Sequence, residues 1–140
     1  MELAALGVEA VEESLQDIAQ GKRPIAQPKE GATRALKITK QECEIDWSQD
    51  AQTISQKIRA FTSIPGAWTR FRADTVKVDS VAITELSLAP GSIQVIDKVL
   101  VVGTSSQAIS IGYLTPSGKS RMDANSWLNG ARIAEGDHFG

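Results

Sequence analysis

The chain has 140 residues, 41% of them hydrophobic, so it can bury one modest core and carry extensions. Its net charge is only −2, it contains no run of eighteen apolar residues, and its first residues lack the positive charge of a secretion signal. We therefore expect a cytoplasmic protein that does not enter a membrane. The single cysteine, Cys43, and the single histidine, His138, exclude an internal disulfide and predict no metal site.

A helix is predicted over residues 1–20, because apolar residues recur there at spacings of three and four. They form one stripe, made of Ala4, Val8, Val11, Leu15 and Ile18. Gly21 follows at the position where a left-handed C-terminal cap is expected. Exposed apolar surface costs about 25 cal/mol per Å². We therefore expect the stripe to pack on the rest of the chain, to self-associate with a second copy, or to fray.

Residues 21–44 are predicted to be an extended linker, since Pro24, Pro28 and Gly31 interrupt regular structure. The linker is basic, in contrast to the segment before it. Residues 1–20 carry a net charge of −5, whereas residues 21–41 carry +5. Such a segment can be merely solvated, or it can bind a polyanion, and the second interpretation makes nucleic acid a candidate partner.

A second helix is expected after this linker, with either Ser48 or Asp50 as its N-cap. Its apolar face is formed by Ala51, Ile54, Ile58 and Phe61. Pro65 and Gly66 then end the helical pattern, because proline removes a backbone donor and glycine admits a tight turn.

From residue 67 onwards the pattern is typical of β-strands separated by turns. Turn signals occur at Pro90-Gly91 and at Asp97-Lys98. The five expected strands cover residues 67–72, 76–83, 93–95, 99–102 and 108–114.

The second of these strands changes its inward face part of the way along. Its apolar residues move from even to odd positions: Val76, Val78, Val81 and Ile83. A β-bulge near Asp79 or Ser80 would explain this shift, because a bulge inserts one residue and so reverses the alternation.

Five short strands within about fifty residues suit a mainly β fold, a small five-stranded Greek-key barrel of the oligonucleotide-binding (OB) type. A β-sandwich is the alternative, although it normally uses about seven strands. A short helix, begun by Asp123 and ended by Gly130, is expected to close one end of the barrel with Trp127 in its core.

Catalytic chemistry has little support in this sequence. His138 lies close to the C-terminus, where we expect fraying, and Cys43 is interpreted as an inert residue beside the linker. The segment from Gly112 to Ser120 resembles a phosphate-binding P-loop. Five residues rather than four separate Gly112 from Gly118, however, and Pro116 removes an amide donor, so we exclude nucleotide binding.

Six short motifs extend over most of the chain. In order they are Lys37-Ile38-Thr39-Lys40, Ile45-Asp46-Trp47-Ser48, Arg59-Ala60-Phe61, Pro65-Gly66-Ala67-Trp68, Gly118-Lys119-Ser120-Arg121-Met122 and Trp127-Leu128-Asn129-Gly130. Their order and spacing resemble the linker and C-terminal domain of the methionyl-tRNA formyltransferase family. The family often has a tryptophan where Ile64 stands and a second lysine where Ser120 stands.

The resemblance implies an enzyme that formylates the amino group of methionyl initiator tRNA with 10-formyltetrahydrofolate. The family's catalytic residues belong to an N-terminal domain whose motifs are absent here, so this chain is expected to be inactive alone and to bind no cofactor. Residues 1–20 would be the end of that missing domain, 21–44 a basic linker and 45–140 the OB-like C-terminal domain. Initiator tRNA and the missing catalytic domain are the expected partners.

Basic side chains are the expected tRNA contacts, because phosphate contacts dominate the affinity of proteins for nucleic acids and carry little sequence information. Lys37 and Lys40 fall on the family's basic linker motif, and the further candidates are Arg34, Lys119, Arg121 and Arg132. Two alternatives remain open. The chain could be the equivalent accessory domain of another folate-dependent formyltransferase or hydrolase, or a purely structural domain.

Overall fold

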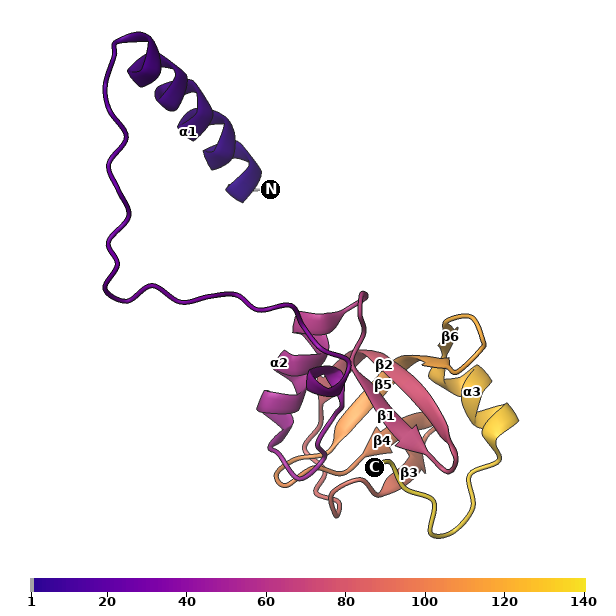
Figure 1. The fold of residues 1–140 in the computed structure, drawn as a ribbon. Helices are drawn as coiled ribbons and strands as arrows, with labels where there is room; N and C mark the ends of the chain where they lie inside the picture. Colours follow the sequence, from indigo (N-terminus) through magenta and orange to yellow (C-terminus); the bar gives the residue numbers. More distant parts are fainter. Residues whose placement is uncertain (1) are drawn as a thin grey trace. The chain divides into compact units, whose positions relative to one another are not determined.

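The computed structural model describes residues 2–140, which fall into two compact units, one ending at Leu36 and one running from Lys37 to Gly140. The first unit consists of helix α1 (Glu2–Ala19) and an extended segment (Figure 1). The predicted cap is confirmed, because Gly21 has a φ of 72° and the Lys22 N–H donates to the Asp17 carbonyl over 3.0 Å.

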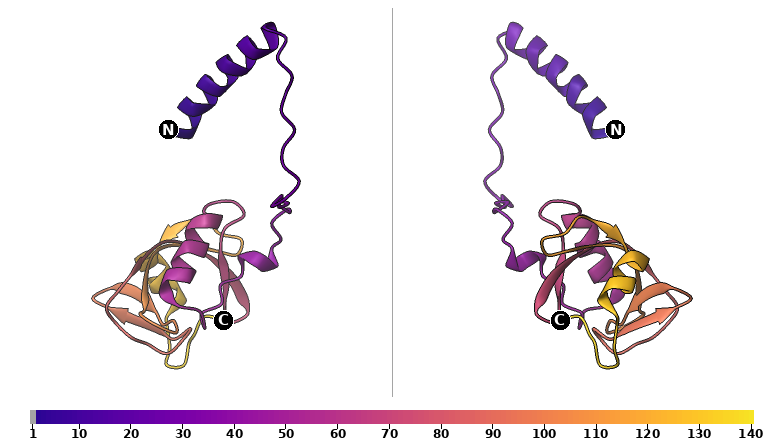
Figure 2. Two further views of the ribbon diagram at one scale, coloured as in Figure 1. Left: turned by 90° about the vertical axis from the view of Figure 1, so that its left-hand side faces the viewer. Right: turned by 90° about the vertical axis from the view of Figure 1, so that its right-hand side faces the viewer.

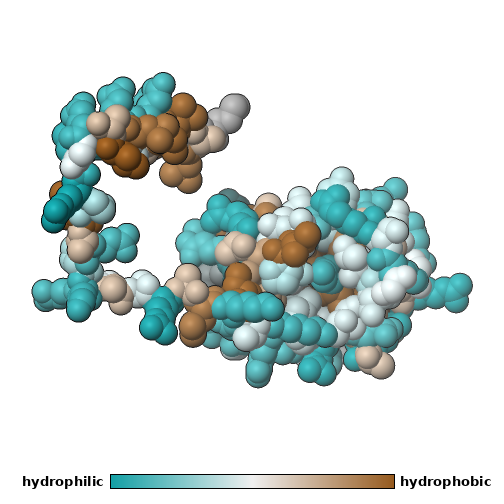
Figure 3. All heavy atoms as spheres, turned by 45° about the horizontal axis from the view of Figure 1, so that its top comes forward, coloured by the Kyte–Doolittle hydropathy of each residue, from teal (hydrophilic) through white to brown (hydrophobic). Residues whose placement is uncertain are grey.

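The apolar stripe of α1 is exposed to solvent. Figure 3 shows apolar atoms gathered along one side of this helix. The exposed side chains are Leu3, Leu6, Val8, Val11, Leu15 and Ile18. Within the first unit no other segment covers this side of the helix, and packing on the second unit or self-association through this side stays a prediction.

The second unit begins with residues that the sequence assigned to the linker. Residues 37–44 belong to this unit and include a short 3-10 helix, η1 (Gln41–Cys43), whose Cys43 is buried. Helix α2 (Ala51–Phe61) follows as predicted. Asp50 is its N-cap and accepts a hydrogen bond from the Thr53 N–H over 2.9 Å.

Six strands form one antiparallel sheet: β1 (Trp68–Phe71), β2 (Asp74–Ile83), β3 (Ile93–Ile96), β4 (Val99–Val102), β5 (Ile109–Pro116) and β6 (Met122–Asp123). The main path runs β1-β2-β5-β4-β3, and the short β6, which was not predicted, pairs with β5. Since β2 lies beside β5 and β3 to β5 follow one another as hairpins, the connection is a Greek key. The sheet curls into an OB-like half-barrel (Figure 1), which confirms the expected mainly β fold.

The C-terminal tail lies between the two ends of this sheet. His138 forms a bridge with Ser92, just before β3, and Phe139 forms one with Phe71 in β1. Phe139 is only 2% exposed, and its ring lies 5.8 Å from the rings of both Trp47 and Phe71. The expectation of a frayed C-terminus is therefore wrong, because Phe139 anchors the tail in the core.

The predicted β-bulge in β2 is also wrong. Asp79 lies opposite Tyr113 and Val81 lies opposite Ile111, so the register passes through Ser80 without an inserted residue. Ser80 instead adopts a left-handed conformation with a φ of 55°. A Cβ on Gly112 would stand 2.9 Å from the Ser80 carbonyl oxygen, so the missing side chain of Gly112 admits this close approach.

Helix α3 (Ala124–Ala131) begins where expected, because the Asp123 side chain accepts a hydrogen bond from the Ser126 N–H over 2.9 Å. It ends at Ala131, one residue beyond the predicted Gly130, and the next residue, Arg132, is left-handed. The two views of Figure 2 place α2 and α3 on opposite sides of the barrel. Within residues 2–140, no helix has the length and apolar composition needed to span a bilayer.

Candidate functional site

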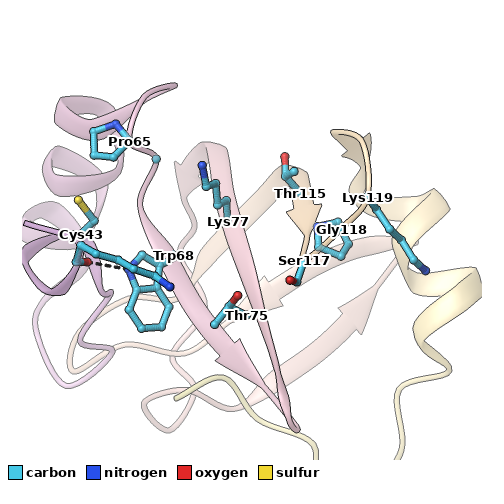
Figure 4. A pocket seen from close by; sticks show the side chains of 12 residues that line it. Cys43, Pro65, Trp68, Thr75, Lys77, Thr115, Ser117, Gly118 and Lys119 are labelled. Carbon is cyan, nitrogen blue, oxygen red and sulfur yellow. Dashed lines mark hydrogen bonds between the residues drawn. The ribbon is translucent and has the colours of Figure 1, made fainter.

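A groove of about 440 Å³ on the second unit gathers lysines and hydroxyl groups. Its walls come from η1, from the connection between α2 and β1, from β1 and β2, and from the end of β5 with the turn after it (Figure 4). The lining residues are Lys40, Cys43, Pro65, Gly66, Trp68, Thr75, Lys77, Thr115, Pro116, Ser117, Gly118 and Lys119. The lining contains three lysines and no carboxylate, so this groove favours an anion.

Lys40 stands on the η1 side of the groove. Its backbone forms the N-cap of η1, and its carbonyl accepts a hydrogen bond from the Trp68 indole N–H over 2.8 Å. Its ammonium group lies 5.5 Å from the centroid of the Trp68 ring, at the distance of a cation–π contact. Lys40 is therefore placed beside the groove by a contact between residues far apart in the sequence.

Lys77 comes from β2 and was missed by sequence reasoning. It alternates with the buried Val76 and Val78, so it faces outward, and it lies opposite Thr115 of β5. A Cβ on Gly66 would stand 2.9 Å from the Lys77 Cδ, so Gly66 gives the lysine stem its room. The outward alternation of Lys77 was visible in the sequence, but its proximity to Lys40 was not.

The third lysine, Lys119, lies at the margin of the groove. It belongs to the turn between β5 and β6, and Figure 4 shows its side chain pointing away from Lys77. The same turn is tied to β2 because the Ser117 N–H donates to the Thr75 carbonyl over 3.0 Å. Lys119 thus contributes charge at the rim, while Lys40 and Lys77 flank the centre.

Arg121, another predicted contact, is engaged in an internal ion pair. Its Nε and Nη2 donate to the two carboxylate oxygens of Asp79 over 2.8 Å and 2.7 Å. The guanidinium also lies 3.6 Å from the centroid of the Tyr113 ring. The hydrogen bond to Asp79 raises the pKa of Arg121 above its ordinary value, so the arginine stays charged but is locally neutralised.

The remaining predicted residues do not line the groove. Arg132 is the left-handed residue after α3, where its carbonyl accepts a hydrogen bond from Arg72. Lys37 is the first residue of the second unit, and Arg34 belongs to the first unit. Of the predicted residues, only Lys40 and Lys119 line the groove. Lys77 also lines it and was not predicted.

In the part of the chain that the structure describes, no arrangement of side chains supports metal-dependent or nucleophilic catalysis. No three His, Cys, Asp or Glu side chains gather among residues 2–140 to hold a metal ion. Cys43 is 1% exposed, and its Sγ lies 3.4 Å from the Thr39 carbonyl oxygen. The groove can therefore bind and orient an anionic group, but it offers no group poised to react with one.

Fold and groove together define a small OB-like barrel domain with a basic, carboxylate-free surface groove. The chain belongs to the formyl transferase C-terminal domain family, whose family model matches residues 37–132. This match begins at the first residue of the second compact unit and ends before the tail that carries Phe139.

The chain is similar to several bacterial methionyl-tRNA formyltransferases. The chain is 38% identical over 133 residues to that of Mycobacterium sp. (strain KMS), covering 94% of this chain and 43% of that protein. It is 35% identical over 141 residues to that of Thermobifida fusca (strain YX), covering 99% and 46%. The chain therefore spans less than half the length of these relatives.

Solved structures show the same fold at greater sequence distance. HypX from Aquifex aeolicus aligns with a TM-score of 0.70 and 22% identity, over 89% of this chain and 23% of HypX. At this identity the likeness concerns the fold alone.

Proposed function

We propose that this chain is the tRNA-holding C-terminal part of a methionyl-tRNA formyltransferase. Such an enzyme transfers a formyl group from 10-formyltetrahydrofolate to the amino group of methionyl initiator tRNA, a step of translation initiation in the bacterial cytoplasm. The formyl acceptor in this proposal, methionyl-tRNA, is taken from the names of the relatives. The observation that carries the proposal is the groove, whose lining includes Lys40, Lys77 and Lys119 and no carboxylate.

The groove suits a phosphodiester backbone better than a base. Lysine ammonium groups and threonine or serine hydroxyls are common partners of phosphate oxygens, and they position a nucleic acid without reading its sequence. Trp68 is only 8% exposed, so it offers little surface on which a base could stack. Shape and charge of a folded tRNA are therefore the features that this surface recognises.

We expect tRNA binding and formyl transfer to be carried out by different domains. Formyl transfer needs groups that bind folate and move protons, and the groove contains none of these in reactive arrangement. We expect the chain to hold tRNA and the catalytic domain to supply the reaction. Purified alone, the 140 residues should transfer no formyl group.

Binding of an initiator tRNA transcript at several salt concentrations tests the proposal. In Lys40→Gln/Lys77→Gln, affinity should fall, and the slope of log affinity against log salt should flatten by about one to two units, because each lost phosphate contact contributes about 0.7–0.9. Different tRNAs should lose affinity by similar factors. The matched control is Lys98→Gln, on the β3–β4 turn outside the groove, which should leave the slope unchanged.

An unchanged slope and affinity in the double variant would contradict the proposal. The domain would then be a structural accessory of the catalytic half, or the equivalent domain of a formyl-transferring or formyl-hydrolysing enzyme that does not act on tRNA.

A further inference from the structure

We propose that Trp68 is a positioning residue, which holds the backbone of Lys40 so that the end of the basic segment stays beside the groove. This inference rests on the proposed function, because it concerns how the groove keeps its tRNA-binding charge in place.

Trp68 holds the segment at both ends of η1. Its indole N–H donates to the Lys40 carbonyl over 2.8 Å, and its own carbonyl accepts a hydrogen bond from the Ile45 N–H over 2.8 Å. Glu44 and Trp68 also form a parallel β-bridge. Trp68 of β1 is therefore hydrogen-bonded to both ends of the turn from Lys40 to Ile45.

The turn is well ordered internally, so its attachment decides where Lys40 lies. The Thr39 N–H and hydroxyl both donate to Glu42 Oε2 over 2.7 Å, and the Glu42 N–H lies 3.3 Å from the Thr39 hydroxyl oxygen. The Thr39–Glu42 pair has the reciprocal hydrogen bonds of a capping box, although the N-cap of η1 is Lys40. The Thr39 hydrogen bonds hold the pKa of the Glu42 carboxyl below its usual range. The buried Cys43 and the hydrogen bond from Lys57 Nζ to the Glu44 carbonyl anchor the far end of the turn, so loss of the indole N–H releases the Lys40 end.

Trp68 differs from the other two tryptophans in its surroundings. Trp47 and Trp127 pack against Phe139 in the core, whereas Trp68 lines the groove and has Lys40 and Arg70 near its ring. Trp47 makes a comparable bond, since its indole N–H donates to the Thr69 hydroxyl over 2.9 Å within the core. Trp47 therefore provides a matched control for the loss of an indole hydrogen bond.

The test is a double-mutant cycle on tRNA binding with the full chain. Trp68→Phe should lower affinity for an initiator tRNA transcript about 3-fold to 10-fold and flatten the salt slope by about 0.7–0.9, as Lys40→Gln does. The double variant should bind no more weakly than Lys40→Gln alone, because both changes remove the same contact. The Cys43 and Glu44 amides, which bond within the turn, should exchange faster in Trp68→Phe.

A control variant and the single variants distinguish a failure of this inference from a failure of the proposed function. Trp47→Phe should lower the Tm but leave the salt slope unchanged. If Lys40→Gln flattens the slope and Trp68→Phe does not, or if their effects add, Trp68 is only structural and this inference fails. If Lys40→Gln alone has no effect, this inference fails, whereas the proposed function fails only if Lys40→Gln/Lys77→Gln also has no effect.

A second variant covers the case in which Trp68→Phe does not fold. Benzothienylalanine at position 68 keeps the ring shape without the N–H and should reproduce the loss of affinity. A wild-type salt slope in that protein would overturn the positioning role.

Discussion

Charged residues in this domain differ in whether a neighbouring side chain already pairs with their charge. Arg121 is paired with Asp79, and Arg72 donates to both carboxylate oxygens of Asp137 over 3.0 Å and 2.6 Å. The groove lysines have no carboxylate in the same lining. Counting basic residues along the sequence therefore overestimates the unpaired positive charge available to an anionic partner.

We expect Asp137 to make the stability of the domain depend on pH. Its hydrogen bond from Arg72 lowers the pKa of its carboxyl, and the Ala134 N–H donates to it as well. Since the pKa is lower in the folded chain than in the unfolded chain, the ionised carboxylate stabilises the fold above the unfolded value. This stabilisation is lost as the pH falls through the folded pKa.

We therefore expect Asp137→Asn to lower the Tm at neutral pH, and the gap from the wild type to close as the pH falls from about 5 to about 2. Thermal unfolding over this range measures the gap. Glu30→Gln, in the first unit, serves as the control and should show no gap at any pH. A gap for Asp137→Asn that stays constant with pH would show that the carboxylate charge is not involved.

At the scale of elements, the short C-terminal tail contacts both ends of the sheet. The Phe139 N–H donates to the Gly91 carbonyl over 2.8 Å, and the Gly140 N–H donates to the Arg70 carbonyl over 3.1 Å. The tail therefore occupies the place of a strand between β1 and the start of β3. Its aromatic anchor contacts rings from three other parts of the chain.

Truncation of this anchor should cost much of the domain's stability. We expect Phe139→Ala to lower the free energy of unfolding by about 3–5 kcal/mol, the usual cost of removing a buried phenylalanine ring. Urea unfolding measures the change. The exposed neighbour His138→Ala should stay within about 0.5 kcal/mol of the wild type. Equal effects of the two variants would mean that the tail acts through its backbone only.

At the scale of the whole molecule, the buried core belongs to one unit, whereas basic residues occur in both units. All the buried residues described lie between Cys43 and Phe139, within the second unit, whereas Lys22, Arg23, Lys29 and Arg34 belong to the first. The first unit therefore adds charge and an apolar helix face, while the second holds the core and the groove.

A shortened chain of residues 37–140 should keep the Tm of the full chain, because it retains every buried residue described. It should bind tRNA with a shallower salt slope, since it lacks four of the six basic residues of the linker. Sedimentation of both chains would show whether the apolar side of α1 pairs two copies. A clearly lower Tm for the shortened chain would mean instead that α1 packs on the barrel.

Local chemistry made several elements predictable from the sequence. The Asp50 cap and the spacing of Ala51, Ile54 and Ile58 predicted α2, and Gly21 predicted the end of α1. Caps and periodicities act over a few residues, so one stretch of sequence contains all the information they need. The alternating strands likewise indicated a small Greek-key barrel, and the order of motifs indicated the family.

The groove and the closure of the barrel depended on contacts between residues far apart in the chain. Lys40 meets Trp68 across 28 positions, and Phe139 lies opposite Phe71. The predicted bulge failed for the same reason, because the left-handed Ser80 is tolerated only where Gly112 of another strand leaves space. The sequence by itself determined the elements and the family, whereas only the tertiary structure decided which charges share one surface, since strand register and core packing set those distances.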